Sequence, residues 1–143
     1  MVYSLIYRSR ACHEMSSQEL SQLLRQSQRY NRRHRISGLL LYANQQFMQL
    51  LEGDYYAVKQ LRHRIGQDVR HSNMTILLDG PQPRRLFPDW SMGLLEVDAA
   101  EFTWLDGYID PHLRADLIPP TYNTGRVIMG LLEDFVADRA VLV

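Results

Sequence analysis

The sequence predicts a single α+β domain, in which one β-sheet carries two helices on one face and C-terminal helices on the other. Two observations support this fold class. Short apolar stretches with the composition of strands are interrupted twice by segments whose apolar residues recur every three or four positions. The resulting order, β-α-β-β-α-β-β, is typical of a ferredoxin-like sheet. The 143 residues leave room for this domain and a short helical extension.

The first strand is predicted over residues 2–7, which are rich in β-branched, aromatic and aliphatic side chains. Because successive side chains of a strand point to opposite faces, Tyr3, Leu5 and Tyr7 share one face and Ile6 belongs to the other. We expect this strand to be buried.

Both helices have recognisable starts. Ser16 and Glu19 form a capping-box signature, so the first helix is predicted to begin near Ser17 and to run to about residue 33. Asp54 is the expected N-cap of the second helix. The apolar residues that define this second helix recur at helical spacing: Val58, Leu61, Ile65 and Val69.

The remaining strands are short apolar stretches separated by turn residues. They are predicted at residues 39–42, 46–52, 75–78 and about 90–95. A tight turn at residues 43–45 makes the first two of these a hairpin. Gly80-Pro81-Gln82-Pro83 is predicted as the turn before the last strand.

Residues 98–143 are predicted as a helical extension of a domain that spans residues 1–97. The extension contains the apolar segment 102–105 and, after Pro119-Pro120, an amphipathic helix with apolar residues between positions 127 and 135. Because the sheet face opposite the two helices needs a cover, we expect the extension to pack on that face or on a partner subunit.

Composition and charge argue against several functions. Sixteen Lys and Arg residues balance sixteen Asp and Glu residues, so no overall field attracts nucleic acid or an anionic membrane. We interpret the basic run at residues 29–35 as a solvated helix end. One cysteine, Cys12, and five histidines without paired ligand spacing predict neither a disulfide nor a metal site. With no signal peptide and no apolar run long enough to cross a bilayer, we expect a cytoplasmic protein.

Polar residues interrupt the inward stripe of the first helix. The stripe contains leucines, among them Leu23, and continues at the same spacing to Ser27 and Asn31. Two interpretations are open: the helix end emerges into solvent, or these side chains have polar partners in the interior.

Gln49 interrupts a second apolar face, because it lies between Phe47 and Leu51 on one side of its strand. A buried amide needs partners for both its donors and its acceptor, and the hydroxyl of Tyr7 is one candidate. The remaining partners must come either from the protein or from a ligand, and a ligand with carbonyl and ring nitrogen atoms would suit.

These polar positions lie within segments that keep a fixed order over roughly residues 1–97. The segments are Leu5-Ile6-Tyr7-Arg8-Ser9-Arg10-Ala11, Asn31, Ile36-Ser37-Gly38-Leu39-Leu40, Phe47-Met48-Gln49-Leu50-Leu51-Glu52-Gly53, Asp68-Val69-Arg70-His71-Ser72-Asn73 and Phe87-Pro88-Asp89-Trp90-Ser91-Met92-Gly93. Each segment alone is weakly specific, whereas the set closely resembles the BLUF family of flavin-binding blue-light photoreceptors.

The resemblance implies that a flavin, usually FAD, lies between the two helices with its ring edge over the sheet; FMN or riboflavin would also be tolerated. Tyr7 and Gln49 correspond to the photoactive pair: on excitation the tyrosine gives up an electron and a proton, and the glutamine amide then rotates or tautomerises. No residue is expected to be catalytic. The positions expected to hold the flavin are Tyr7, Leu23, Ser27, Asn31, Gln49, Arg64, Ile65, Asp68, Arg70 and His71. For Arg64 and Asp68, an exposed i,i+4 ion pair is the alternative interpretation.

Trp90 and Met92 are expected to share a face of the last strand, and they match positions that pass the signal onward in the family. Plain core packing is the alternative for both. Output is expected to pass through an unidentified downstream protein, and we expect a homo-oligomer.

Two other functions remain open. An enzyme on this scaffold would need a nucleophile with its base or paired catalytic carboxylates, and the sequence shows neither. A flavin-free interaction domain would be colourless when purified.

Overall fold

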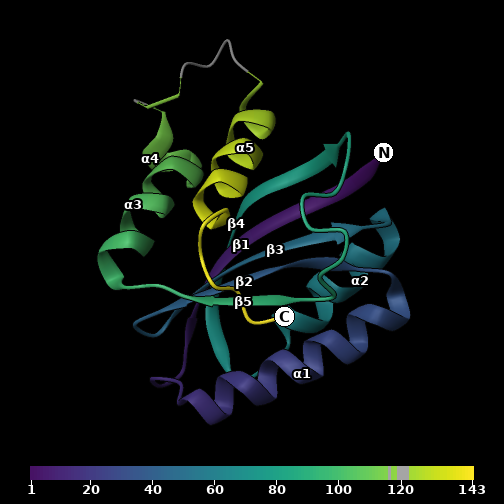
Figure 1. Cartoon of the computed structure of the whole chain (residues 1–143), viewed down its shortest axis with the longest axis vertical. Coiled ribbons are helices and arrows are strands. Elements are labelled where there is room, and N and C mark those ends of the chain that lie inside the picture. Colours follow the sequence, from purple (N-terminus) through teal and green to yellow (C-terminus); the bar gives the residue numbers. More distant parts are fainter. Residues whose placement is uncertain (116, 119–122) are drawn as a thin grey trace.

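The structure is a computed structural model that describes residues 1–115, 117–118 and 123–143. Its centre is a five-stranded sheet in the order β4-β1-β3-β2-β5 (Figure 1). The strands are β1 (Val2–Ala11), β2 (Ser37–Ala43), β3 (Gln46–Gly53), β4 (His71–Gln82) and β5 (Gly93–Glu96). The helices are α1 (Ser17–His34), α2 (Tyr55–Gly66), α3 (Ala99–Ile109), α4 (Pro111–Arg114) and α5 (Thr124–Val136).

The sheet contains both antiparallel and parallel strand pairs. β1 pairs antiparallel with both β3 and β4, and β2 forms an antiparallel hairpin with β3. β5 returns parallel to β2 at the other edge. Because β4 and β5 occupy opposite edges, the loop between them, residues 83–92, has to cross from one side of the sheet to the other.

Alternation along the strands separates two apolar cores. Leu5 and Leu51 face α1 and α2, where they pack with Leu20 and Val58. The neighbouring strand residues, among them Ile6 and Leu50, face the other way. The predicted α+β fold, with two helices on one face and C-terminal helices on the other, is therefore confirmed.

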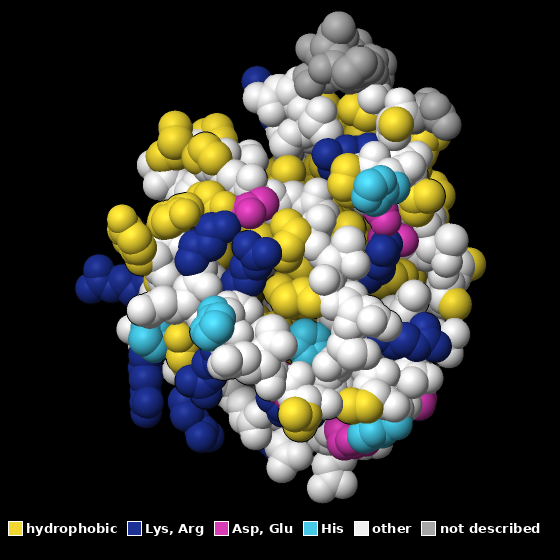
Figure 2. All heavy atoms as spheres, turned by 180° about the vertical axis from the view of Figure 1, so that it is seen from behind, with side chains coloured by type: hydrophobic (Ala, Val, Ile, Leu, Met, Phe, Trp, Pro, Cys, Tyr) yellow, Lys and Arg dark blue, Asp and Glu magenta, His cyan; other side chains and the backbone are white. Residues whose placement is uncertain are grey.

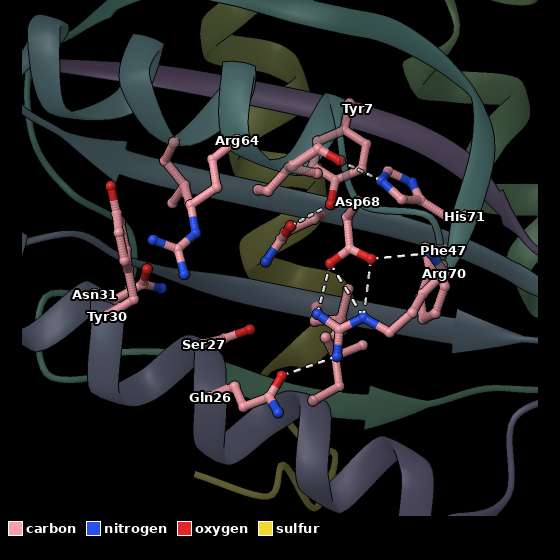
Figure 3. Close-up of a pocket in the computed structure, with 15 residues that line it drawn as sticks. Tyr7, Gln26, Ser27, Tyr30, Asn31, Phe47, Arg64, Asp68, Arg70 and His71 are labelled. Atoms are coloured by element: carbon pink, nitrogen blue, oxygen red, sulfur yellow. Dashed lines mark hydrogen bonds and ion pairs between the residues drawn. The ribbon is translucent and has the colours of Figure 1, made fainter.

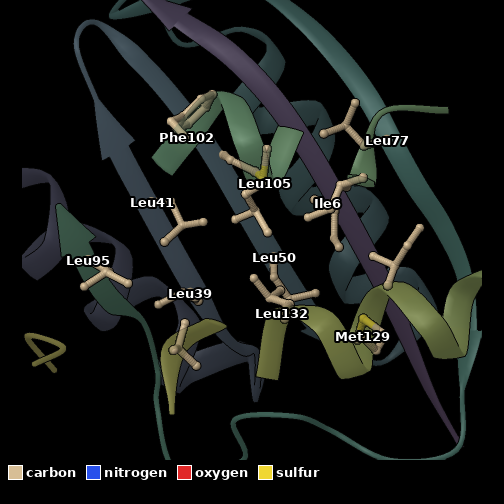
Figure 4. Close-up of a cluster of buried hydrophobic side chains, with 14 of the residues drawn as sticks. Ile6, Leu39, Leu41, Leu50, Leu77, Leu95, Phe102, Leu105, Met129 and Leu132 are labelled. Atoms are coloured by element: carbon tan, nitrogen blue, oxygen red, sulfur yellow. The ribbon is translucent and has the colours of Figure 1, made fainter. Parts of the chain in front are cut away.

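The second core lies between the sheet and the C-terminal helices (Figure 4). Phe102 and Leu105 of α3 and Leu132 of α5 pack against Leu41 and Leu50 of the sheet. The helical extension thus covers this face within the same chain. The predicted helix boundary at Pro119-Pro120 lies outside the described residues.

The predicted turn at Gly80-Pro81-Gln82-Pro83 is wrong for its first three residues, which belong to β4. In that strand Gly80 pairs with Ser4 and Pro81 with Tyr3. Proline lacks a backbone N–H, but β4 is an edge strand, where a missing donor is tolerated. Glycine and proline, which are typical of turns, here belong to an edge strand, so their presence led to the wrong prediction of a turn.

The second helix is shorter than its apolar periodicity predicts. It ends at Gly66, and the side chain of Val69 is 89% exposed in the turn that follows. Val69 matches the helical spacing of the apolar residues, but it lies beyond the end of the helix and does not pack in the core.

The prediction that Trp90 and Met92 share a face of the last strand is also wrong. β5 begins at Gly93, so both residues lie in the preceding loop. Trp90 packs against the core beneath α3 and α5, whereas Met92 is buried in the core beneath α1 and α2. Parity within a strand could not place residues that lie outside it.

Basic residues project from the C-terminal end of α1. Arg32, Arg33 and Arg35 are exposed there, at the end of the helix dipole that favours cations. Figure 2, which shows the molecule from behind, has lysine and arginine side chains projecting mainly at the left of the view. No helix among the described residues is both long and apolar enough to cross a bilayer.

Candidate functional site

A cavity of about 780 Å³ opens between α1 and α2 above the sheet (Figure 3). Every residue that the sequence predicts to hold the flavin lines this cavity: Tyr7, Leu23, Ser27, Asn31, Gln49, Arg64, Ile65, Asp68, Arg70 and His71. Segments up to 64 positions apart in the chain are thus brought to one site by the fold.

Tyr7 and Gln49 form the floor of the cavity from adjacent strands. They are direct partners in the pairing of β1 with β3, and both side chains are buried. The Tyr7 hydroxyl donates a hydrogen bond to Oε1 of Gln49. Nε2 of Gln49 donates to the sulfur of Met92 at 3.4 Å. The amide therefore has a partner at each end.

Tyr7 is a neutral phenol at neutral pH. Burial, and secondarily the negative charge of Asp68, raises the pKa of Tyr7 well above its usual value. A phenol that keeps its proton can donate a hydrogen bond.

Asn31 lies on the α1 wall with only 1% of its surface exposed. Its Nδ2 donates to the Ser91 carbonyl at 2.7 Å, and Gln28 on the same helix donates to the Met92 carbonyl at 3.0 Å. The interpretation that this end of the helix stripe emerges into solvent is therefore wrong for Asn31. Ser27 is half-buried one turn earlier and also lines the cavity.

A strap of polar side chains crosses between the helices at one side of the cavity. Arg70 pairs with Asp68 at 2.5 Å and donates to Oε1 of Gln26, on α1, at 2.9 Å. The hydrogen bond from Arg70 lowers the pKa of Asp68, so this carboxylate is ionised at neutral pH. Figure 3 shows the three side chains connected in a row.

The alternative i,i+4 ion pair between Arg64 and Asp68 is wrong, since Asp68 bonds Arg70 instead. The Arg64 guanidinium lies 4.6 Å from the centre of the Tyr30 ring, across the cavity on α1. Its donors are consequently left near the cavity rather than tied to a carboxylate.

His71 begins β4 close to Tyr7. Its Nε2 lies 2.6 Å from the Ile65 carbonyl at the end of α2, and its ring centre is 6.3 Å from that of Tyr7. This contact ties the end of the α2 wall to the sheet.

Five further lining residues were not among the sequence candidates: Gln26, Tyr30, Leu40, Phe47 and Leu61. Gln26 and Tyr30 each directly precede a predicted site residue on α1, and they are not part of the inward stripe that the helical spacing selected. Leu40 lies opposite Gln49 in the β2–β3 pairing, and that register would have identified it.

The side chains that line the cavity suit a flavin ring in their chemistry. Leu23 on α1 and Ile65 on α2 supply apolar walls that can enclose a flat ring from its two faces. The amides of Gln49 and Asn31 offer donors and acceptors to a ring edge that carries carbonyl and nitrogen atoms. Within the described ranges, no three His, Cys, Asp or Glu side chains are grouped so as to hold a metal ion.

Comparison with known proteins gives a match over the same segment. Residues 2–93 match the BLUF family, described as sensors of blue light using FAD. The blue light- and temperature-regulated antirepressor BluF of Escherichia coli (strain K12) is 33% identical over 141 residues, which cover 99% of this chain and 31% of the relative. The photoactivated adenylate cyclase subunit beta of Euglena gracilis is 39% identical over 90 residues, which cover 62% of this chain and 10% of the relative. The chain thus spans less than a third of the length of either curated relative.

Solved structures of similar length share the fold. The ground state of BlsA superposes with a TM-score of 0.73 at 26% identity and covers 98% of this chain and 91% of its own. The dark-state structure of BlrB, a BLUF protein, has a TM-score of 0.68 at 31% identity, with 95% of each chain covered. With the family matched over residues 2–93 and the predicted flavin-lining residues gathered in one cavity, this chain belongs to the BLUF family of flavin-binding blue-light sensors.

Proposed function

We propose that this protein holds FAD between α1 and α2 and senses blue light through a hydrogen-bond switch made by Tyr7 and Gln49. The observation that carries the proposal is the buried chain of contacts from the Tyr7 hydroxyl through the Gln49 amide to the sulfur of Met92. It joins a proton and electron donor to a group whose donor and acceptor ends can exchange. When bound, the flavin supplies the absorption of blue light and an acceptor for the tyrosine's electron.

The switch works through the asymmetry of the Gln49 amide. In the present arrangement its oxygen accepts from Tyr7 and its nitrogen donates to Met92. Rotation or tautomerisation would place a different group toward Tyr7 and toward the ring edge. Because a buried hydrogen bond contributes on the order of 1 kcal/mol, such an exchange is sufficient to bias a two-state element.

The remaining site residues are assigned to holding the flavin. Leu23 and Ile65 enclose the ring, and Ser27, Asn31 and Arg64 offer polar contacts. The Asp68–Arg70 pair and His71 keep the α2 side of the cavity in place. A structure of the similar protein BlrP1 from Klebsiella pneumoniae contains FMN, which supports FMN as an alternative to FAD in this cavity; riboflavin is a further proposed alternative.

Trp90 and Met92 are proposed to pass the change onward. Met92 contacts Gln49 directly, whereas Trp90 lies two residues away on the opposite face of the sheet. A shift of this short segment therefore couples the flavin side to the side covered by residues 98–143.

Output is proposed to occur through another protein rather than through catalysis by this chain. One relative is named an antirepressor and another an adenylate cyclase subunit, so related domains serve different outputs. We propose a cytoplasmic protein that contacts an unidentified downstream protein and forms homo-oligomers, without binding nucleic acid or membranes. The extension at residues 98–143 is the proposed contact region.

The absorption spectrum in the dark and under blue light tests the proposal. We expect a yellow protein whose flavin bands shift reversibly to the red. Tyr7→Phe and Gln49→Leu should keep bound flavin and lose the shift, because one removes the donor and the other the exchangeable amide. Tyr56→Phe and Gln60→Leu are matched controls at exposed positions of α2 and should retain it.

Three results would contradict the proposal. A red shift that persists in Tyr7→Phe or Gln49→Leu would remove that residue from the switch. Protein that stays colourless after incubation with FAD would favour an interaction domain. Steady oxidation of a nicotinamide by the yellow protein would favour an enzyme.

A further inference from the structure

We propose that Glu52, together with Arg85, is a positioning pair that holds the β4–β5 loop in the geometry through which a change at Gln49 reaches α5. This inference rests on the proposed light switch and extends it to residues outside the flavin cavity. Neither Glu52 nor Arg85 lines that cavity.

Glu52 is a fully buried carboxyl at the end of β3, three residues after Gln49. Its two oxygens accept hydrogen bonds from consecutive backbone N–H groups of the loop, those of Leu86 at 2.6 Å and Phe87 at 3.1 Å. The Ser37 hydroxyl is a third, longer contact at 3.4 Å. The loop backbone is thus fixed by a side chain of the sheet.

Arg85 fastens the same loop from the outside. Its guanidinium donates to the Ser37 hydroxyl at 2.8 Å, to the Glu52 carbonyl at 3.2 Å and to the Arg35 carbonyl at 2.7 Å. Arg35 is the left-handed C-cap of α1, so Arg85 satisfies a carbonyl at the end of that helix. The loop is therefore tied at once to α1, β2 and β3.

The part of the loop beyond this anchor carries the contacts to the photoactive site. The Trp90 carbonyl accepts from Gly38 at 3.0 Å, and the Met92 sulfur accepts from Gln49 at 3.4 Å. The Phe87 and Trp90 rings stack with centres 4.6 Å apart. Because Phe87 is bonded to Glu52 through its backbone, the position of the Trp90 ring depends on that carboxyl.

The same loop also reaches the C-terminal helices. Arg84 contacts Glu133 of α5 at 3.3 Å, and Phe87 and Trp90 pack against the core that includes Ile128 and Leu132. One loop thus touches the Gln49 switch at one end and α5 at the other. Because Trp90 lies two residues from Met92 and packs against the core that includes α5, a displacement of Met92 can reach α5 through the Trp90 ring, which Phe87 holds in place.

The burial of Glu52 supports a positioning role over simple packing. Burial raises the pKa of this carboxyl despite its hydrogen bonds, so the group is costly to keep in the interior. Among the residues that the structure describes, Arg85 supplies the positive charge that acts on this carboxyl. What the carboxyl provides, and an apolar residue would not, is acceptors for two successive loop N–H groups.

The test compares wild type with Glu52→Gln by amide hydrogen exchange, in protein loaded with FAD. Glutamine keeps the size but has one acceptor oxygen, so one loop N–H loses its partner. We expect Leu86 or Phe87 to exchange about tenfold faster or more in the dark. Glu96→Gln, at an exposed carboxyl on β5, is the matched control and should exchange as wild type. Unchanged exchange at both loop amides would overturn the anchor.

The functional readout is the difference between light and dark at the amides of α5. In wild type we expect exchange at Ile128 to Leu132 to change on illumination. In Glu52→Gln the flavin red shift should keep its amplitude, while the change at α5 falls severalfold. An equal α5 response in both proteins, or none in wild type that shows the red shift, would overturn the proposal.

Arg85→Lys serves as a second variant if Glu52→Gln does not fold. Lysine keeps the charge but cannot reach the three acceptors, so it should also reduce the α5 response and retain the red shift. Loss of the red shift in wild type itself would refute the light switch. In that event the dark exchange of Leu86 and Phe87 would still decide whether Glu52 anchors the loop.

Discussion

At the scale of single residues, burial of Tyr7 affects both the protonation of its phenol and the stability of the fold. The phenol lies on the floor of the cavity, bonded to Gln49, in a site from which water is largely excluded. Such burial keeps the proton on the oxygen, which is the form that a coupled loss of an electron and a proton requires. Glu52, on the neighbouring strand β3, is buried for a different purpose, since its acceptors are directed at loop backbone.

The raised pKa of Tyr7 predicts a loss of stability in alkaline solution. An unfolded tyrosine loses its proton near pH 10, whereas folded Tyr7 keeps it, so its contribution is complete below about pH 10 and declines above. The free energy of unfolding should fall by up to about 1.4 kcal/mol per pH unit from this residue.

Urea unfolding between pH 9 and 11 measures this slope. Tyr7→Phe should be less sensitive to pH than wild type by that amount, while Tyr56→Phe, at a side chain that is 75% exposed, keeps the wild-type slope. Burial also raises the pKa of Tyr42, which remains in all three proteins and therefore cancels in the comparison. Identical slopes in wild type and Tyr7→Phe would mean that the phenol is not buried as described.

At the scale of elements, the two halves of α1 have different roles: the first half packs in the core, and the second half lines the cavity. The capping box at Ser16 and Glu19 satisfies orphan donors at its start, and Leu20 and Leu24 bury its first half. Toward its end Asn31 turns to the cavity and to the 83–92 loop. One face of the helix therefore packs in the core near its N-terminus and contributes to the cavity near its C-terminus.

Strand β2 depends on a glycine for its contact with β3. A Cβ added at Gly38 would collide with the backbone oxygen of Leu50, which cannot move without breaking the pairing. We expect Gly38→Ala to lower the free energy of unfolding by at least about 2 kcal/mol.

Gly80→Ala provides the control, because a Cβ there meets no atom within 4 Å. Its effect should stay within about 0.5 kcal/mol in the same denaturant titration. Comparable losses in the two variants would show that the close approach of β2 and β3 is relaxed in solution.

At the scale of the whole molecule, the sheet separates a flavin cavity from a helical cover. α1 and α2 lie over one face, and α3 and α5 over the other (Figure 1). Strands β1 and β3 direct side chains into both cores, and the loop at residues 83–92 runs past the ends of these strands. A signal that leaves the cavity can therefore reach the cover without passing through solvent.

The cover should contribute substantially to stability. Leu132 of α5 is buried against the sheet, so Leu132→Ala is expected to cost about 2–5 kcal/mol through lost contacts and a cavity. Val127→Ala, at a side chain on the same helix that is 40% exposed, should cost less than about 0.5 kcal/mol. Chemical denaturation followed by circular dichroism distinguishes them, and equal effects would mean that α5 does not pack on the sheet as a unit.

The sequence by itself determined the fold class and the starts of α1 and α2. These features follow from short-range patterns, because capping, helical spacing and strand parity depend on residues within a few positions of one another. The motif set added the remaining flavin-lining candidates, which composition alone would not have selected.

Only the tertiary structure decided where Pro81, Val69, Trp90 and Met92 lie. Whether a proline ends a strand depends on whether that strand is at a sheet edge, and whether a valine is buried depends on what lies opposite it. The same holds for Glu52, whose partners Leu86 and Phe87 contribute only backbone atoms. Every residue except proline carries the same N–H, so no pattern in the sequence marks the ones that a distant carboxyl will bind.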